Sequence, residues 1–312
     1  MSYAHIADAL ATRRRFLIDA ATGTELERRG VEMDPAAWCG PSTLQHRSVL
    51  VDIHRDYVDI GAELITANTF ASGPSMLRAA GYDDQHIAIV NAAVDAVREA
   101  IASSPHLVAI AGSMSHMIPV LPGTDVVDPS LGLVPPRFHE DCVRHATALA
   151  DAGVDVLLLE MMYQPDRAAI VLDAARSTGL PVWFGISARR GQSGDVISFD
   201  PHSATPLVEL LGLASGSVDA VSVMHTRADI IEDVLKVVRG VTNEPLVIYP
   251  DSGHFEMPSW NFTEVMSPAD FGGYCERWLR IGVSAVGGCC GLGPDHLRAA
   301  RSAIDRANDR PC

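Results

Sequence analysis

The sequence predicts an α/β protein that folds as a (β/α)8 TIM barrel, with one domain spanning residues 1–312. Short apolar runs alternate with helix-like stretches along the whole chain, a pattern typical of repeated βα units and a parallel sheet. There are eight such runs, whereas a doubly wound sheet normally stops at about five to seven strands. No GxGxxG motif follows the first run, which also disfavours a dinucleotide-binding fold.

Each expected strand is an apolar run that ends in a turn and is followed by a helix-like stretch. Amphipathic stretches such as CVRHATALADAG and CERWLRIG supply the intervening helices. A segment rich in proline and glycine, residues 118–138, reads as one long loop. The expected strands lie within residues 15–23, 62–70, 106–114, 154–162, 181–189, 218–226, 245–253 and 283–291.

Composition argues against several classes of partner. The formal net charge is -15, and the sequence shows no cluster of Lys and Arg that could bind nucleic acid. The N-terminal residues lack the apolar core of a signal peptide, and no apolar run is long enough to span a bilayer. We therefore expect a cytoplasmic protein with no nucleic-acid or membrane partner; the sequence leaves a homo-oligomer open.

Polar and metal-binding residues fall at the downstream ends of the apolar runs. In (β/α)8 barrels, the catalytic groups sit at the C-terminal ends of the strands. The residues at the downstream ends of the runs are therefore predicted to gather at one edge of the barrel and to form the functional site. From this set we expect six residues to bind substrate: Asp19, Thr22, Asn68, Glu160, Ser187 and Asp251.

Two adjacent cysteines, Cys289 and Cys290, lie among glycines in the stretch VGGCCG. Neighbouring side chains of a regular strand point to opposite faces, so both sulfurs can reach one atom only if the backbone leaves the strand. The flanking glycines permit this conformation. The pair therefore predicts two thiolate ligands for one soft metal ion, with Zn²⁺ as the leading candidate. The alternatives are two small buried residues at a tight turn or a strained vicinal disulfide.

A catalytic zinc site usually has a third protein ligand and one open position. The histidines at strand ends, His116, His225 and His254, are the candidates for this ligand. We favour His225, because it ends the run VDAVSVMH and should enter the barrel mouth near Cys289.

Motifs along nearly the whole chain resemble those of the homocysteine S-methyltransferase family. GGCCG followed by GPDHL is similar to the zinc-binding signature of the family. The stretches DAATGTEL at 19–26, HRDYVDIGAELITANTF at 54–70 and AGVDVLLLEMM at 152–162 are similar to other family segments in order and spacing.

The resemblance implies a zinc-dependent methyltransferase. Such an enzyme holds the homocysteine sulfur as a thiolate, which takes a methyl group from a sulfonium or quaternary ammonium donor. It implies that Cys289 and Cys290 bind zinc and that Asp19 and Glu160 act at the catalytic site by recognising the α-amino group. A carboxylate that ends an apolar run, such as Glu160, is costly to bury unless it meets a cation.

Two segments depart from the family pattern. The family usually reads GxNC at the sixth strand, with a third zinc cysteine, whereas this chain has Met224 and His225. An imidazole can replace a thiolate on zinc, so we expect a His-Cys-Cys site. At the seventh strand, YPDSGH places Asp251 and His254 where the family has an amide and an acid.

The departure at the seventh strand bears on the identity of the methyl donor. An extra carboxylate suits a cationic donor, and Trp38, Trp260 or Tyr249 could supply an aromatic face for it. The loop at 114–138 is expected to influence donor choice. Two other functions stay open: a zinc hydrolase with Asp251 or His254 as base, and a binding protein that has lost the metal.

Overall fold

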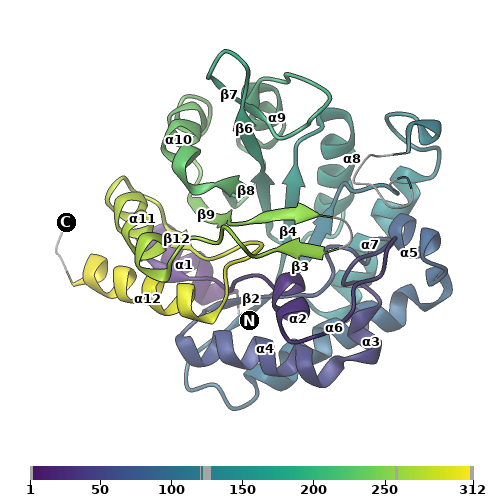
Figure 1. The fold of residues 1–312 in the computed structure, drawn as a ribbon, viewed down its shortest axis with the longest axis horizontal. Helices are drawn as coiled ribbons and strands as arrows, with labels where there is room; N and C mark the ends of the chain where they lie inside the picture. The colour runs from purple at the N-terminus through teal and green to yellow at the C-terminus, as the bar shows by residue number, and fades with distance from the viewer. Residues whose placement is uncertain (1–2, 120, 122–127, 257–258, 310–312) are drawn as a thin grey trace.

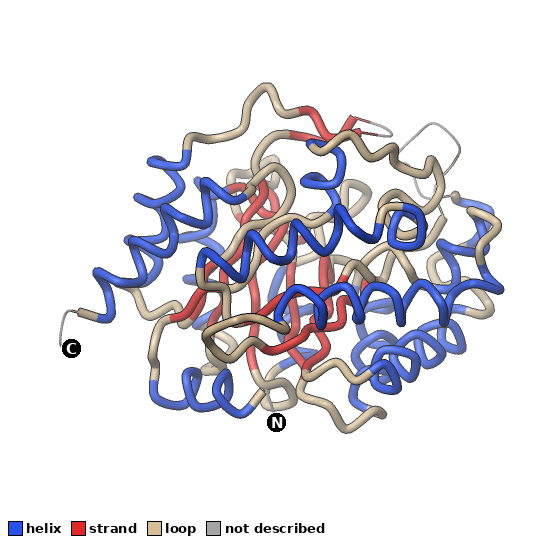
Figure 2. Tube along the Cα trace, turned by 90° about the horizontal axis from the view of Figure 1, so that it is seen from below, coloured by secondary structure: helices blue, strands red, loops and turns tan. Residues whose placement is uncertain are grey.

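The computed structural model describes residues 3–119, 121, 128–256 and 259–309 and forms a parallel eight-stranded barrel (Figure 1). The strand order is β1-β12-β9-β8-β5-β4-β3-β2. A parallel bridge between Ile18 and Leu64 joins the two ends of this order and closes the barrel. Figure 2 shows the strands gathered at the centre with helices around them. The predicted (β/α)8 fold is confirmed.

All eight predicted strands are present. The first and last are short: β1 ends two residues before Asp19, and β12 stops at the glycines before the cysteine pair. The strands are β1 (Phe16–Leu17), β2 (Leu64–Ala67), β3 (Ala109–Ser115), β4 (Val156–Met162), β5 (Val182–Ile186), β8 (Ala220–Arg227), β9 (Leu246–Asp251) and β12 (Ala285–Val286).

Helices follow each barrel strand and form an outer ring. Most neighbours in this ring pack on one another, and α12 returns to pack beside α4. The ring helices are α4 (Arg47–Ile60), α6 (His86–Ile101), α7 (Phe138–Ala152), α8 (Pro165–Arg176), α9 (Leu207–Ala214), α10 (Ile231–Arg239), α11 (Pro268–Arg280) and α12 (Pro294–Asn308). The other helices are α1 (Ala4–Thr12), α2 (Gly23–Arg28), α3 (Ser42–Gln45), α5 (Pro74–Ala79), η1 (Asp83–Gln85), η2 (Pro129–Leu131) and η3 (Ala228–Ile230).

Strand alternation divides the core into two layers. In β4, Leu157 and Leu159 pack outward against the helices, while Val156 and Leu158 belong to the barrel interior. Glu160 is next on the inward-facing side, so the strand pattern itself aims it into the barrel. Helix α1 adds Ile6 to the interior cluster and so helps fill the barrel.

Two hairpins that the sequence did not predict extend from strand ends. They are β6 (Ala188–Arg190) with β7 (Val196–Ser198), and β10 (His254–Glu256) with β11 (Ser259–Asn261). The described part of the expected loop at 118–138 contains the short helix η2, and Phe138 already begins α7; residues 120 and 122–127 lie outside the described residues. Among the described residues, none of the helices is both long and apolar enough to cross a membrane.

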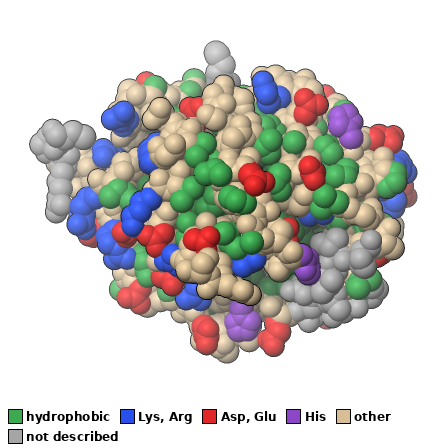
Figure 3. Space-filling model, turned by 90° about the horizontal axis from the view of Figure 1, so that it is seen from above, with side chains coloured by type: hydrophobic (Ala, Val, Ile, Leu, Met, Phe, Trp, Pro, Cys, Tyr) green, Lys and Arg blue, Asp and Glu red, His purple; other side chains and the backbone are tan. Residues whose placement is uncertain are grey.

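Charged side chains of both signs are interspersed on the face shown in Figure 3. Hydrophobic side chains gather toward the middle of this face. The acidic surplus therefore does not form one continuous patch on this side of the molecule.

The buried histidines predict how stability depends on pH. Burial lowers the pKa of His54 to about 3 and that of His145 to about 4; burial also lowers the pKa of His86 to about 3. These groups are neutral in the folded state but bind protons in the unfolded state below about pH 6.5. The free energy of unfolding should therefore fall as pH drops from about 6.5 toward 4, as measured by urea unfolding.

A His54→Leu variant tests this linkage. Neither ring nitrogen of His54 has a hydrogen-bond partner in the described part of the chain, so leucine removes a proton site without breaking a bond. Its stability loss between pH 7 and 5 should be smaller than that of the wild type by about 2 kcal/mol. His139→Leu, at an exposed position, is the control. Equal pH slopes for the wild type and His54→Leu would contradict the assignment.

Candidate metal centre and active-site cavity

The backbone leaves the barrel immediately before the cysteine pair. A Cβ on Gly287 would lie 2.4 Å from the carbonyl oxygen of Asp19, so only glycine allows the chain to pass there. The Cys289 amide donates to the Pro250 carbonyl at 2.8 Å, and the carbonyl of Cys290 accepts from the Ser252 amide at 2.9 Å. The end of β9 therefore holds both cysteines in place, outside a regular strand.

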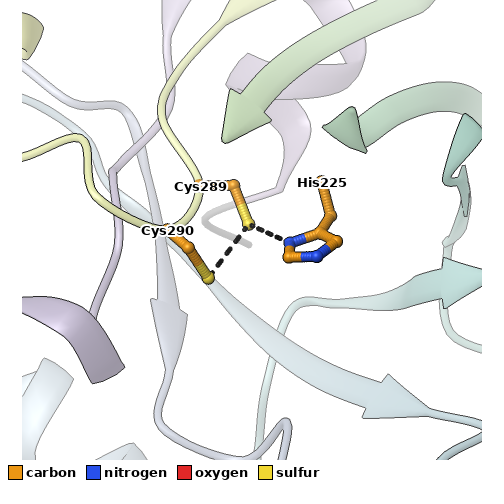
Figure 4. Close-up of side chains that lie close together, drawn as sticks. All are labelled: His225, Cys289 and Cys290. Atoms are coloured by element: carbon orange, nitrogen blue, oxygen red, sulfur yellow. Dashed lines mark hydrogen bonds between the residues drawn. The ribbon is translucent and has the colours of Figure 1, made fainter. Parts of the chain in front are cut away.

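His225 reaches the same place through a second irregularity. The pairing of β8 with β9 shifts register between Met224 and Arg227, and His225 within this bulge has a φ of 42°. Left-handed backbone is unusual for a residue other than glycine and concentrates at functional sites. Figure 4 shows the His225 ring directed at Cys289, with Cys290 on the other side of that sulfur.

The three side chains fit a zinc ion. The Sγ atoms of Cys289 and Cys290 are 3.8 Å apart, and Cys289 Sγ is 3.9 Å from His225 Nδ1. The ligand atoms of the three residues all lie within 4.8 Å of one another. Tetrahedral zinc, with bonds of about 2.3 Å to sulfur and about 2.0 Å to nitrogen, sets ligand atoms roughly 3.5–3.8 Å apart. The cysteines are free thiols, separated too far for a disulfide.

The other two candidate histidines are elsewhere. His116 is fully buried, and its Nε2 accepts from the amides of Tyr163 and Gln164 at 3.0 and 3.1 Å. His254 is exposed on the β10–β11 hairpin, where it pairs with Asn261. Within the described residues, His225 alone joins the cysteine pair in a possible metal site.

Charges near the cluster favour a cation. Burial by itself lowers the pKa of His225, but the charge of Asp251, the hydrogen bond with Cys289 and the charge of Glu160 raise it to about 9. The neighbouring Cys290 and burial raise the pKa of Cys289 well above its usual value. Without a metal, the imidazole therefore holds a proton; a bound divalent ion would replace this positive charge and stabilise the thiolates.

Two carboxyl groups face the metal-site cluster across the cavity. Burial raises the pKa of Asp19 to about 7, although the Thr66 amide donates to its Oδ2 at 2.6 Å. Burial also raises the pKa of Glu160, which accepts a hydrogen bond from Ser113. Neither carboxyl group forms an ion pair with a described residue. An uncompensated acidic pair of this kind is suited to a cationic ligand.

One cavity of about 340 Å³ connects the cluster with these carboxyl groups. None of the described residues that line it is Lys or Arg. Its polar wall contains the metal-site cluster, the two carboxyl groups and Thr22. Its aromatic wall is formed by Trp38, Phe70, Tyr163, Phe199, Tyr249, Phe255 and Trp260.

The remaining predicted substrate-binding residues differ in position. Asn68 lines the cavity, but its side chain bonds to Cys39 and Thr43. Ser187 is fully buried, donates to Met224 Sδ at 3.3 Å and is not among the lining residues. Asp251 lines a separate polar cavity of about 470 Å³. It acts on the centre through its charge near His225 rather than from the cavity wall.

Two site residues, Thr66 and Phe199, were missed in the sequence, whereas Ser113 lies at the end of the third expected strand. Thr66 and Ser113 hold the two carboxyl groups, and the ring of Phe199 lies 5.1 Å from that of His225. Alternation along the β2 run could have placed Thr66 near the interior. Phe199 follows an unpredicted hairpin, so no comparable signal marked it.

Comparison with known proteins agrees with these features. The family model for homocysteine S-methyltransferase matches residues 16–304. A selenocysteine methyltransferase from Astragalus bisulcatus is 27% identical, with 91% of each chain covered. A homocysteine S-methyltransferase from Escherichia coli is 26% identical, covering 92% of this chain and 94% of that protein.

Solved structures show the same fold. The metallated form of the homocysteine methyltransferase MmuM from Escherichia coli has a TM-score of 0.71 at 22% identity, covering 97% of this chain and 99% of that one. Its oxidized form has a TM-score of 0.72, covering 95% and 98%.

Gly291 offers a test of the backbone around the cysteines. Its φ is 80°, and a Cβ there would lie 1.8 Å from the Ser252 carbonyl oxygen. Gly291→Ala should therefore lower the free energy of unfolding by about 3 kcal/mol or more. At Gly194, with a φ of 86° and open space around it, alanine should cost only about 1–2 kcal/mol. Equal losses in urea unfolding would contradict this geometry.

Proposed function

The chain belongs to the homocysteine S-methyltransferase family, and we propose that it transfers a methyl group from a sulfonium or quaternary ammonium donor to the thiol of homocysteine at a His-Cys-Cys zinc site, forming methionine. The observation that carries this proposal is the single cavity shared by His225, Cys289, Cys290, Asp19 and Glu160. A soft-metal ligand set and a carboxyl pair around one cavity match an amino acid that carries a thiol.

The proposed ligands are His225, Cys289 and Cys290, and the cavity side leaves room for an acceptor sulfur. Zinc bound by this set would keep the acceptor thiol as a thiolate at neutral pH. The complex of a divalent ion with two thiolates and one neutral imidazole has a formal net charge of zero. Three thiolates, as is usual in the family, would add one more negative charge.

Asp19 and Glu160 are proposed to hold the α-ammonium group of the acceptor. Both are buried, and neither forms an ion pair with a described residue, so the substrate ammonium would supply a partner for them. Their bonds from Thr66 and Ser113 fix the carboxyl groups before substrate arrives. This arrangement would orient the acceptor and its sulfur for in-line attack.

The rest of the cavity is suited to an onium donor. Its walls combine aromatic rings with acidic side chains, and both attract a positive charge. When the acceptor sulfur attacks the methyl carbon, the bond from methyl to the donor heteroatom breaks. The electron pair leaves with that heteroatom, which becomes neutral.

The alternatives are less well supported. Hydrolysis requires a base within reach of a cavity water, but Asp251 lines the separate cavity and His254 is exposed on its hairpin. A binding protein without metal would not need three ligand atoms within 4.8 Å of one another. The proposed cellular compartment is the cytoplasm, and a homo-oligomer stays open.

The direct test is a methyl-transfer assay with the zinc-loaded protein, homocysteine and a panel of sulfonium and quaternary ammonium donors. We expect methionine with at least one donor and no product without the thiol. Removal of the metal by a chelator should abolish turnover, and added zinc should restore it. Product formation that is unaffected by metal removal would contradict the mechanism.

Glu160→Gln should weaken acceptor binding. The substitution keeps the shape of the side chain but removes the charge proposed to meet the ammonium group, so the KM for homocysteine should rise at least about tenfold. Glu209→Gln, at an exposed position of α9, is the matched control. An unchanged KM in Glu160→Gln would exclude this role for the carboxylate.

A further inference from the structure

We propose that Thr24 and Arg28, on helix α2, are positioning residues for residues 287–291, here called the cysteine loop, and that they set its metal affinity. This inference rests on the zinc site of the proposed function. Neither residue belongs to the ligand set, and neither is among the residues lining the cavity. Both instead bond to the backbone of Gly291, directly after Cys290.

Thr24 holds the amide of this glycine. Its Oγ1 accepts from Gly291 N at 3.0 Å, and the Thr24 side chain is completely buried. A buried amide that loses its acceptor is costly, because water cannot replace the bond. This contact therefore fixes one side of the peptide unit that follows Cys290.

Arg28 holds the carbonyl of the same glycine. Its Nη2 donates to Gly291 O at 3.0 Å, and Nη1 bonds to the buried carboxylate of Glu25. The guanidinium also lies 4.7 Å from the centre of the Phe262 ring. Three partners thus restrict the Arg28 side chain, so it can act as a fixed support for the loop.

The cysteine loop is consequently held from two sides. On the other side, Ser252 N donates to the Cys290 carbonyl, while Trp260 Nε1 donates to the Ser252 carbonyl at 3.0 Å. The Thr24 and Arg28 bonds keep Gly291 against this support, so close that an added Cβ would lie 1.8 Å from the Ser252 carbonyl oxygen. Fixing the backbone beside Cys290 prevents the sulfurs from separating and lowers the cost of ordering them around an ion.

Arg29 provides a matched control for Arg28. It lies next in the chain and bonds to Glu25 at 3.1 Å, but its other partner among the described residues is Asp56 rather than the cysteine loop. Arg28→Ala and Arg29→Ala both remove a cation from Glu25, whereas only the first frees the Gly291 carbonyl. Thr24→Val removes the acceptor at nearly constant shape, and Thr24→Ser keeps it.

The experiment measures zinc affinity by chelator competition on the full-length proteins. Thr24→Val and Arg28→Ala should bind zinc at least about tenfold more weakly than the wild type, with Thr24→Ser and Arg29→Ala within about threefold. Cobalt-loaded protein should show altered thiolate-to-metal absorption in the first two variants only. Wild-type affinity in Thr24→Val and Arg28→Ala, or an equal loss in Arg29→Ala, would overturn the proposal.

Hydrogen exchange separates this proposal from the proposed function. In full-length protein treated with chelator, the Gly291 amide should exchange at least about tenfold faster in Thr24→Val than in the wild type or Thr24→Ser. Unchanged exchange would overturn the positioning role whether or not zinc binds. Faster exchange in a protein whose wild type binds no zinc would support the contact but overturn its link to metal affinity and the zinc site itself.

Discussion

The structure depends on the exit of the chain from the barrel at Gly287. Strand β12 consists of two residues, and the next backbone passes so close to the Asp19 carbonyl that no side chain fits. This early exit frees Cys289 and Cys290 from strand alternation and lets their sulfurs lie 3.8 Å apart. The same contact brings the cysteine loop beside Asp19. One backbone constraint therefore joins the metal-ligand set to a carboxyl group of the cavity.

The cavity combines features that are costly without a ligand. Asp19 and Glu160 are buried without an ion pair to any described residue, and His225 has a left-handed backbone conformation. Each feature lowers stability, and each is explained by binding: the carboxyl groups would meet an ammonium ion, and the bulge at His225 aims its imidazole at the sulfurs. The helices and the outer core supply the stability that offsets these costs.

Much of this architecture could be predicted from the sequence. Periodic apolar runs mark all eight strands, and strand ends mark Asp19, Glu160, His225 and the cysteines on one rim. Bulges were not predictable, because the register shift after Met224 depends on pairing with β9. The same register shift moves the pairing of Asp251, so its position at the end of β9 did not predict which cavity its side chain lines. Ser187 also lies just after a strand, and its hydroxyl donates to Met224 Sδ in the structure. Their substrate-binding roles stay predictions.

The central claim is that an imidazole completes the metal site in place of the usual third cysteine. Elemental analysis of protein purified without added metal, beside His225→Ala, tests it most directly. The account predicts about one zinc per chain in the wild type and its loss in the variant, with a restored site in His225→Cys. Full zinc in His225→Ala, or no zinc in the wild type, would contradict it.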